Sequence, residues 1–276
     1  MINSIKAEWR KLIRRPAIWW LGGFILAIVP IVYTFSWIQY NSPNFHPDAG
    51  ATLAQLKAQL YPANFAAMMA SGLGFIGGAL MLVMGALTVG SEYGWTTFKT
   101  VYTQRPGRLP VLAGQFASIS AVSALVVAGV YALAAISSVT IANLSGAAIV
   151  WPAVTDIIKA VAATWLIFEV WMLLGMAMAY LFRQSALAIG LGLAYMLAIE
   201  GILFRALSTL HISWLTTVEK FMVGQNASSL AGSFPTSGFR APTTLVSADH
   251  AVLVVIAYAL TFLIASIILV RVRDVV

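Results

Sequence analysis

The sequence has no cysteine, only three histidines and few charged residues. Without cysteine there is no disulfide framework, no thiolate metal site and no cysteine nucleophile. Three histidines argue against a histidine-rich metal site. Charged residues make up 9% of the 276, whereas soluble domains have about 25%, and 61% of the residues are hydrophobic. With a mean hydropathy of +0.89, this composition indicates a membrane protein.

Lysine and arginine outnumber aspartate and glutamate, 16 to 9, which gives a net charge of +7. A basic protein can bind nucleic acid, but these cations do not form patches interleaved with aromatic residues. They flank long apolar runs instead, as is typical of membrane proteins. The sequence therefore predicts contact with membrane lipid and no contact with nucleic acid.

No nucleotide-binding or catalytic motif is present. A P-loop needs Gly-Lys-Ser or Gly-Lys-Thr to hold phosphates, and no lysine in this sequence follows a glycine. No nucleophile-base pair or set of metal ligands occurs at a suitable spacing. We therefore expect no catalytic residue, metal or bound cofactor in this chain.

Six apolar runs are each long enough to cross about 30 Å of hydrocarbon as a helix. The third is longer than a span needs, which predicts a tilt or a bend. Only "RQS" separates the fourth run from the fifth, so these two should form a tight hairpin. The expected fold is all-α, one transmembrane domain over residues 1–276, with spans at about 17–38, 65–90, 111–141, 161–182, 186–204 and 251–270.

The positive charges predict the orientation of the six spans. An even number of spans puts both termini on one side, and most of the 16 cations fall in the segments on that side. Because such segments are usually cytoplasmic, we expect both termini in the cytoplasm and the chain in the plasma membrane. The cations on this side are Lys6, Arg10, Lys11, Arg14, Arg15, Lys99, Arg105, Arg108, Arg183, Arg271 and Arg273.

Residues 1–16 have the pattern of an amphipathic helix. Ile5, Trp9, Leu12 and Ile13 recur at helical spacing, with basic residues on the rest of the turn, and Pro16 ends the helix. We expect an interfacial elbow helix before the first span, although the positive charge alone would also serve as a topology anchor. Its interfacial residues are Trp9, Arg10, Lys11, Arg14 and Arg15.

A polar segment, "SEYGWTTFKTVYTQR" at residues 91–105, separates the second span from the third. Ser91 is a candidate N-cap, and Glu92 in the first turn suits the helix dipole, so a short cytoplasmic helix is predicted. The segment has more aromatic residues than a solvated linker needs. Such rings are common both at protein interfaces and at the headgroup level of a membrane, and the pattern alone does not choose between these.

The 205–250 segment, on the opposite side, is the longest connection. Its stretch "ISWLTTVEKFMV" has apolar residues at helical spacing, and several glycines and prolines follow. We expect a short outer or re-entrant helix there, followed by a loop.

Two carboxylates, Glu169 and Glu200, lie inside the fourth and fifth spans. At about 1.5 Å per residue they would have similar depths and could face each other across the hairpin. Acids inside a membrane often mark a transport path. The structural alternative is that Glu169 is protonated or hydrogen-bonded within the bundle and that Glu200 pairs with Arg205.

The segment between the second and third spans resembles the cytoplasmic coupling region of permeases of the type-2 ABC exporter family. That region commonly has a glutamate, Gly-Thr, a basic residue, and then Pro-x-x-Arg followed by lysine. Thr96 replaces the usual glycine, Pro106 is displaced, and Gln115 replaces the usual lysine. The matching positions are Glu92, Thr97, Lys99 and Arg108, and the aromatic residues Tyr93, Trp95 and Phe98 lie among them.

The resemblance implies a permease subunit that performs no chemistry itself. Two copies of a separate ATPase subunit, which bind ATP and Mg, would dock on the coupling segment, and a second permease subunit would complete a homodimer or heterodimer. The aromatic, weakly charged spans suit an amphipathic, lipid-like or antibiotic-like substrate. The alternative is a proton-driven secondary transporter that uses Glu169 and Glu200 as its proton relay.

Overall fold

A computed structural model describes residues 2–47, 52–95, 107–208, 213–237 and 244–272 of the chain. Throughout these residues the secondary structure is helical, without strands. This confirms the predicted all-α fold. The segment 96–106, which includes most of the predicted coupling segment, lies outside the described residues.

Within the described residues, six helices are long and apolar enough to cross a membrane, which confirms the predicted spans. Each is longer than predicted, by one to seven residues, and the fifth span is an α-helix, α8, that continues as a π-helix, η2. The composition and these helices identify a multi-pass membrane protein. The spans are α2 (Pro16–Tyr40), α4 (Phe65–Gly94), α6 (Arg108–Leu144), α7 (Val154–Phe182), α8 (Ser185–Leu193) with η2 (Ala194–Phe204), and α12 (Ala248–Val272).

Shorter helices lie before and between the spans. The predicted elbow helix is α1 (Ile2–Ile13), and Pro16 opens α2 at the position where proline's fixed φ suits a helix start. The predicted helix between the fifth and sixth spans is α10 (Ser213–Glu219), and a second helix follows it. The remaining short helices are α3 (Leu53–Ala58), η1 (Pro62–Asn64), α9 (Arg205–Ser208) and α11 (Val223–Ala231).

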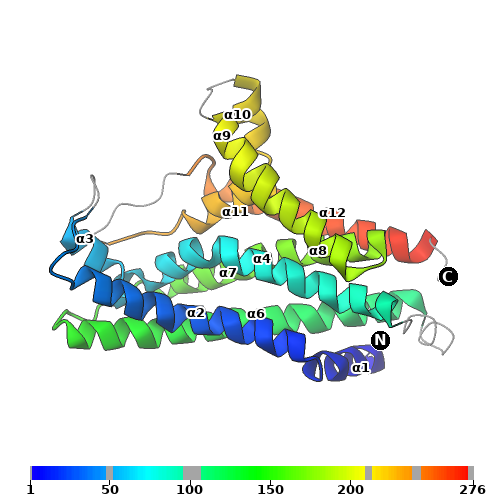
Figure 1. Cartoon of the computed structure of the whole chain (residues 1–276), viewed down its shortest axis with the longest axis horizontal. Helices are drawn as coiled ribbons and strands as arrows, with labels where there is room; N and C mark the ends of the chain where they lie inside the picture. The colour runs from blue at the N-terminus through cyan, green and yellow to red at the C-terminus, as the bar shows by residue number, and fades with distance from the viewer. Residues whose placement is uncertain (1, 48–51, 96–106, 209–212, 238–243, 273–276) are drawn as a thin grey trace.

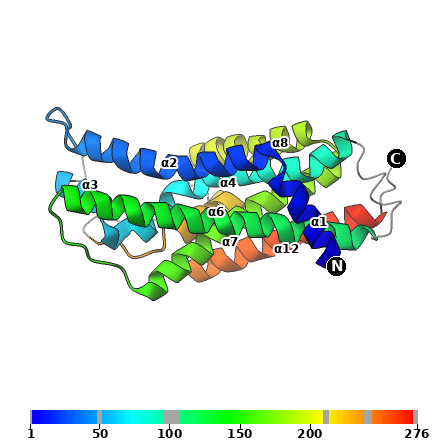
Figure 2. The same cartoon turned by 90° about the horizontal axis from the view of Figure 1, so that it is seen from below.

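The long helices run side by side along the long axis of the molecule (Figures 1 and 2). Helix α1 and the C-terminal end of α12 lie at the same end of the bundle, which we call the α1 end. The last residues of α4 and the first residues of α6 also lie there, on either side of the segment 96–106.

Helices α4 and α7 form the centre of the bundle. They pack closely because glycines on each meet the backbone of the other: a Cβ at Gly85 would collide with the carbonyl of Met172, and a Cβ at Gly175 with the carbonyl of Leu82. Small residues allow such close approach of helices in membranes. Helices α4 and α7 therefore form a tightly packed pair around which the other spans are arranged.

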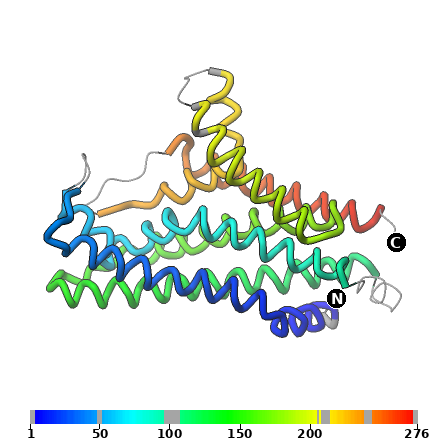
Figure 3. The backbone as a smooth tube through the Cα atoms, viewed as in Figure 1, coloured from blue at the N-terminus to red at the C-terminus, as the bar shows by residue number. Residues whose placement is uncertain are grey.

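The fifth span leaves the bundle part-way along its length. Helix η2 and the short helices α9 and α10 project from the other helices, while α11 returns to the bundle (Figure 3). Few residues of α8, η2 and α12 are buried, and about half of α8 and η2 is exposed. The projecting segment and these exposed faces are where lipid or another protein subunit would contact the chain.

Candidate functional site

Glu92 occupies the last turn of α4. The prediction that Ser91 caps a separate helix with Glu92 in its first turn is wrong, because α4 continues through both residues to Gly94. The side chain of Glu92 is 1% exposed, although it is one of only nine acidic residues in the chain. A buried carboxylate is costly unless it is paired. One oxygen, Oε1, accepts hydrogen bonds from Arg15 and, at 3.4 Å, from Lys11. The acid predicted to begin the coupling segment is therefore bound to the elbow.

Arg15 lies between the elbow helix and the first span and makes three contacts. It donates to Glu92, and it donates to the backbone carbonyl of Thr88 at 3.0 Å. Its guanidinium also lies over the ring of Trp95, 5.5 Å from the centroid, a cation–π arrangement. Arg15 thereby holds the last two turns of α4 against the elbow.

Lys11 joins Glu92 to a second acid, Glu8. The Lys11 ammonium lies 2.6 Å from Glu8 Oε1, and Glu8 is itself only 5% exposed. Burial raises the pKa of the Glu8 carboxyl above its usual range, and the hydrogen bond from Lys11 opposes this rise only in part. Glu8, Lys11, Arg15 and Glu92 form what we call the elbow ion cluster.

Helix α1 docks on α6 as well as on α4. A Cβ at Gly114 of α6 would press against Ser4 and Glu8, and Ser118 donates to the carbonyl of Ile5 at 3.3 Å. Leu12, on the predicted apolar face, is 2% exposed. Part of that apolar face therefore packs against protein, where the sequence suggested lipid alone.

The aromatic residues at the end of α4 have different surroundings. Tyr93 packs edge-on against Tyr180 of α7 with ring centroids 6.4 Å apart, whereas Trp95 is 66% exposed beside Arg15. Tyr180 also donates a hydrogen bond to Gln115, which is fully buried. A lysine at position 115, usual in the coupling region that this segment resembles, would have to bury its charge here.

The structure describes some of the other residues predicted for the elbow and the coupling region. Arg108, at the start of α6, donates to the carbonyl of Val270 at the end of α12, at 3.3 Å. Arg10 and Arg14 are exposed, while Trp9 lines an apolar groove between α1, α2 and α6. Thr97, Phe98 and Lys99 lie outside the described residues.

Glu169, on the fourth span, is buried between α7 and α6. Its Oε2 accepts a hydrogen bond from Ser120 of α6 at 2.8 Å, and the side chain is 4% exposed. Among the described residues, its other oxygen, Oε1, has no hydrogen-bond partner although it too is buried. A buried carboxyl oxygen without a partner marks a place where a proton or a water molecule would be held.

Glu200, on η2, has a different environment. Its Oε1 accepts a hydrogen bond from the hydroxyl of Tyr195, and its Oε2 accepts one from the backbone N–H of Gly224 on α11. Tyr195 lies five residues earlier, and the i→i+5 bonding of a π-helix aligns residues at this spacing better than an α-helix does. A Cβ at position 224 would meet the Glu200 carboxylate, so any residue larger than glycine there would require this side chain to move.

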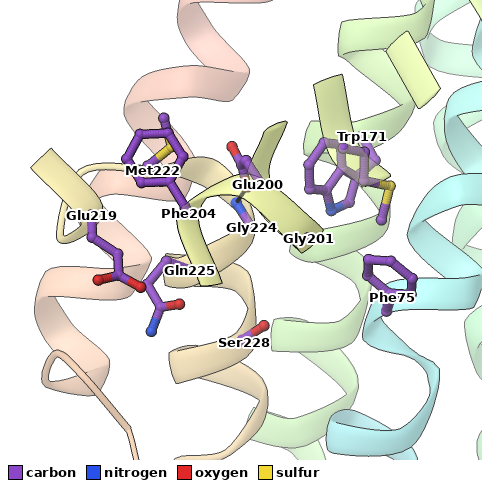
Figure 4. Close-up of a pocket in the computed structure, with 11 residues that line it drawn as sticks. Phe75, Trp171, Glu200, Gly201, Phe204, Glu219, Met222, Gly224, Gln225 and Ser228 are labelled. Carbon is purple, nitrogen blue, oxygen red and sulfur yellow. Dashed lines mark hydrogen bonds between the residues drawn. The ribbon is translucent and has the colours of Figure 1, made fainter. Parts of the chain in front are cut away.

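A cavity of about 240 Å³ opens beside Glu200. Trp171 and Phe75 stand on one side, Glu219 and Met222 on the other, and Glu200 lies between (Figure 4). A second space of about 230 Å³ adjoins it and shares five of its lining residues. We call the first of these two spaces, the cavity of about 240 Å³ beside Glu200, the acid–aromatic cavity.

The structure does not bring Glu169 and Glu200 together. Trp171 lines the cavity beside Glu200, and Glu169, two residues earlier on the same helix, points about 200° away around the helix axis. Glu169 bonds to α6, whereas Glu200 bonds to η2 and α11. The side chain of Arg205, considered as a partner of Glu200, lies outside the described side chains.

Sequence reasoning missed several of the residues that build these sites, among them Glu8, Trp171 and Glu219. Glu8 could have been found, because it lies three residues before Lys11 on a predicted helix, a spacing that allows an ion pair. The sequence around Trp171 and Glu219 does not indicate a site, because these residues reach the cavity only through the packing of α7 and the return of the chain after α10. Among the described residues, no group of three or more histidines or acids is placed to hold a metal ion.

Comparison with protein-family models and with curated proteins finds no match to this chain.

Proposed function

We propose that this chain is the membrane-spanning permease subunit of an ATP-driven export complex of the type-2 ABC exporter class. The observation that carries the proposal is the elbow ion cluster, because it ties the elbow helix to the end of α4 next to the predicted coupling segment. A force on residues 91–105 would act directly on this joint. The resemblance of the segment to exporter coupling regions supports the same function.

The packing of the bundle supports a way to pass such a force onward. Helix α4 is closely packed on α7 through Gly85 and Gly175, and α1 is docked on both α4 and α6. Closure of two partner ATPase subunits around ATP and Mg would push on the coupling segment, and α1, α4 and α7 would move together. Rigid-body rocking of this kind is a common form of domain motion.

The proposed assembly contains two permease subunits, either identical or different, and two ATPase subunits. The positive-inside rule places both termini and the coupling segment in the cytoplasm of a cell whose plasma membrane holds the complex. The location of α1 and the end of α12 at one end of the bundle supports this arrangement. The substrate would cross between the two permease subunits.

Co-purification tests the proposal. The tagged chain, extracted with its native neighbours, should recover an ATPase whose turnover depends on this chain. Phe98→Ala and Lys99→Ala should lower that turnover while leaving membrane insertion intact, and Lys57→Ala, at the other end of the bundle, serves as the control. Recovery of no ATPase, or full coupling in both variants, would show that the proposal is wrong.

A second candidate function has one observation in its favour. Glu169 is a buried acid that accepts a hydrogen bond from Ser120 and whose Oε1 has no hydrogen-bond partner in the described part of the chain. This arrangement suits a proton-carrying group in a transporter. This candidate predicts transport driven by a pH gradient in liposomes that contain the chain alone. The exporter proposal predicts no such transport without the ATPase and ATP.

A further inference from the structure

We propose that the acid–aromatic cavity binds the cationic group of an amphipathic organic molecule. The inference rests on the proposed function only in treating the bound molecule as the transported substrate. It narrows the amphipathic class suggested by the sequence to molecules that carry a positive charge, such as an amine or a quaternary ammonium.

The acidic residues that line the cavity are the first reason to expect a cationic ligand. Two carboxylates from different elements face the cavity, Glu200 from η2 and Glu219 from α10. Among the described side chains, no lysine or arginine lines it, and none forms an ion pair with either acid. A positively charged ligand would supply a partner for two acids in a partly buried space.

The aromatic residues that line the cavity are the second reason to expect a cationic ligand. Trp171, Phe75 and Phe204 border the same space as the acids. The face of an aromatic ring attracts a cation, and cages of such rings are a recurring way to bind quaternary ammonium groups. Carboxylates and rings together favour an organic cation over a hydrated metal ion, which would need several oxygen ligands at short range.

The fixed position of the Glu200 carboxylate is the third reason to expect a cationic ligand. The hydroxyl of Tyr195 and the backbone N–H of Gly224 each occupy one of its oxygens. The carboxylate is therefore oriented before a ligand arrives, which reduces the entropy lost on binding. The π-helix that creates this arrangement is a rare element that occurs often at functional sites.

The apolar part of the lining accounts for the rest of the ligand. Met196 and Met222 border the cavity, and methionine adapts to ligands of varied shape. The adjoining space is lined by Ser71, Gly74 and Ala231 among others. Because typical ligand sites hold about 300–1,000 Å³, the cavity of about 240 Å³ suits a head group or a small cation, with any longer chain extending beyond it.

Equilibrium binding to the purified full-length chain in lipid nanodiscs tests the inference without any ATPase. The probe is radiolabelled benzyltrimethylammonium, with neopentylbenzene as its neutral isostere and phenylmethanesulfonate as an anion. We expect the cation to bind and neither of the other two to compete. Glu200→Gln and Glu219→Gln should each raise the Kd about tenfold, because each removes a negative charge that attracts the quaternary ammonium.

Asp249→Asn is the matched control, because it removes an exposed carboxylate that does not line this cavity, and it should leave the Kd unchanged. Glu219→Gln keeps the test valid if Glu200→Gln does not fold, since Glu219 takes part in neither the Tyr195–Glu200 nor the Gly224–Glu200 hydrogen bond.

Equal competition by neopentylbenzene, or an unchanged Kd in both glutamine variants, would overturn the inference. So would binding that arises only after Arg205→Ala, because the chain's own arginine would then be the cation of the site. If the chain binds the cation but co-purification recovers no ATPase, the proposed function alone is refuted. If co-purification recovers an ATPase but the chain does not bind the cation, this inference alone is refuted.

Discussion

Arg15 donates a hydrogen bond to the buried carboxylate of Glu92 across 77 positions of sequence, joining the elbow to the end of α4. Both side chains are largely removed from solvent, with exposures of 13% and 1%. Removing one member of a buried ion pair leaves an uncompensated charge, which costs about 3–5 kcal/mol. The joint is therefore the place where a single substitution should separate the elbow from the bundle.

We expect Arg15→Gln and Glu92→Gln each to undock α1, and the double variant to be less damaged than the sum of the two. The chain has no native cysteine, so Ser118→Cys can report undocking: Ser118 is 1% exposed beneath α1, and it should be labelled by a thiol reagent only when α1 lifts. Arg14→Gln, at an exposed position, is the control. Strict additivity of the two substitutions would show that the pair is not coupled.

Docking of α1 should also depend on pH through Glu8. Because its pKa is raised in the folded chain, the protonated form is favoured when α1 is docked. The stabilising effect is therefore complete below the ordinary pKa of a glutamate and is lost as the pH rises through the raised value. We expect labelling of Ser118→Cys to speed up over this interval.

Glu8→Gln should remove this component of the pH dependence, so that labelling of Ser118→Cys stays slow as the pH rises. Lys11, Arg15 and Glu92 are the charged groups that act on Glu8, and they are unchanged in this variant. An unaltered pH profile in Glu8→Gln would assign the effect to another group.

The contact between α4 and α7 gives a test of the core. Gly85→Ala would place a methyl group against the carbonyl of Met172, and overpacking of this kind costs about 1–3 kcal/mol. A Cβ at Gly72, on the same helix, meets nothing within 4 Å, so Gly72→Ala should be neutral or stabilise the helix by about 1 kcal/mol. Thermal unfolding in detergent should therefore show a lower midpoint for Gly85→Ala only. Equal midpoints would contradict the close approach of α4 and α7.

The six spans could be predicted because burial in a membrane leaves a strong and local signal: about 20 apolar residues and a helix that satisfies its own backbone. The elbow helix was predictable for a similar reason, since Trp9 and Leu12 recur at helical spacing between basic residues. Such signals depend on near neighbours in the chain.

The elbow ion cluster and the surroundings of Glu200 could not be predicted in this way, because they depend on contacts that the spacing of residues in the sequence does not reveal. Glu92 and Arg15 belong to different predicted features, and only the docking of α1 on α6, which brings the α1–α2 junction to the end of α4, joins them. Glu200 was placed by the geometry of a regular α-helix, but it lies in a π-helix that aligns it with Tyr195. The similar depth expected for Glu169 and Glu200 therefore says nothing about which way either side chain points.

The last prediction concerns Glu169 and separates a structural role from a role in proton transfer. If the carboxyl group only satisfies Ser120 inside the bundle, Glu169→Gln should keep transport, because an amide oxygen can still accept that hydrogen bond. If it carries protons, Glu169→Gln should abolish transport driven by a pH gradient while the fold is retained. Transport in proteoliposomes, with and without ATP and the partner ATPase, measures the difference.

The leucine variants complete this experiment. Glu169→Leu removes both the charge and the acceptor of the Ser120 hydroxyl, and Glu200→Leu does the same for Tyr195 and Gly224. Loss of transport in Glu200→Leu with normal transport in Glu169→Leu would place the path beside the acid–aromatic cavity and leave Glu169 a structural residue. Normal transport in both would remove the two carboxylates from the path altogether, and the substrate would have to cross along another face of the bundle.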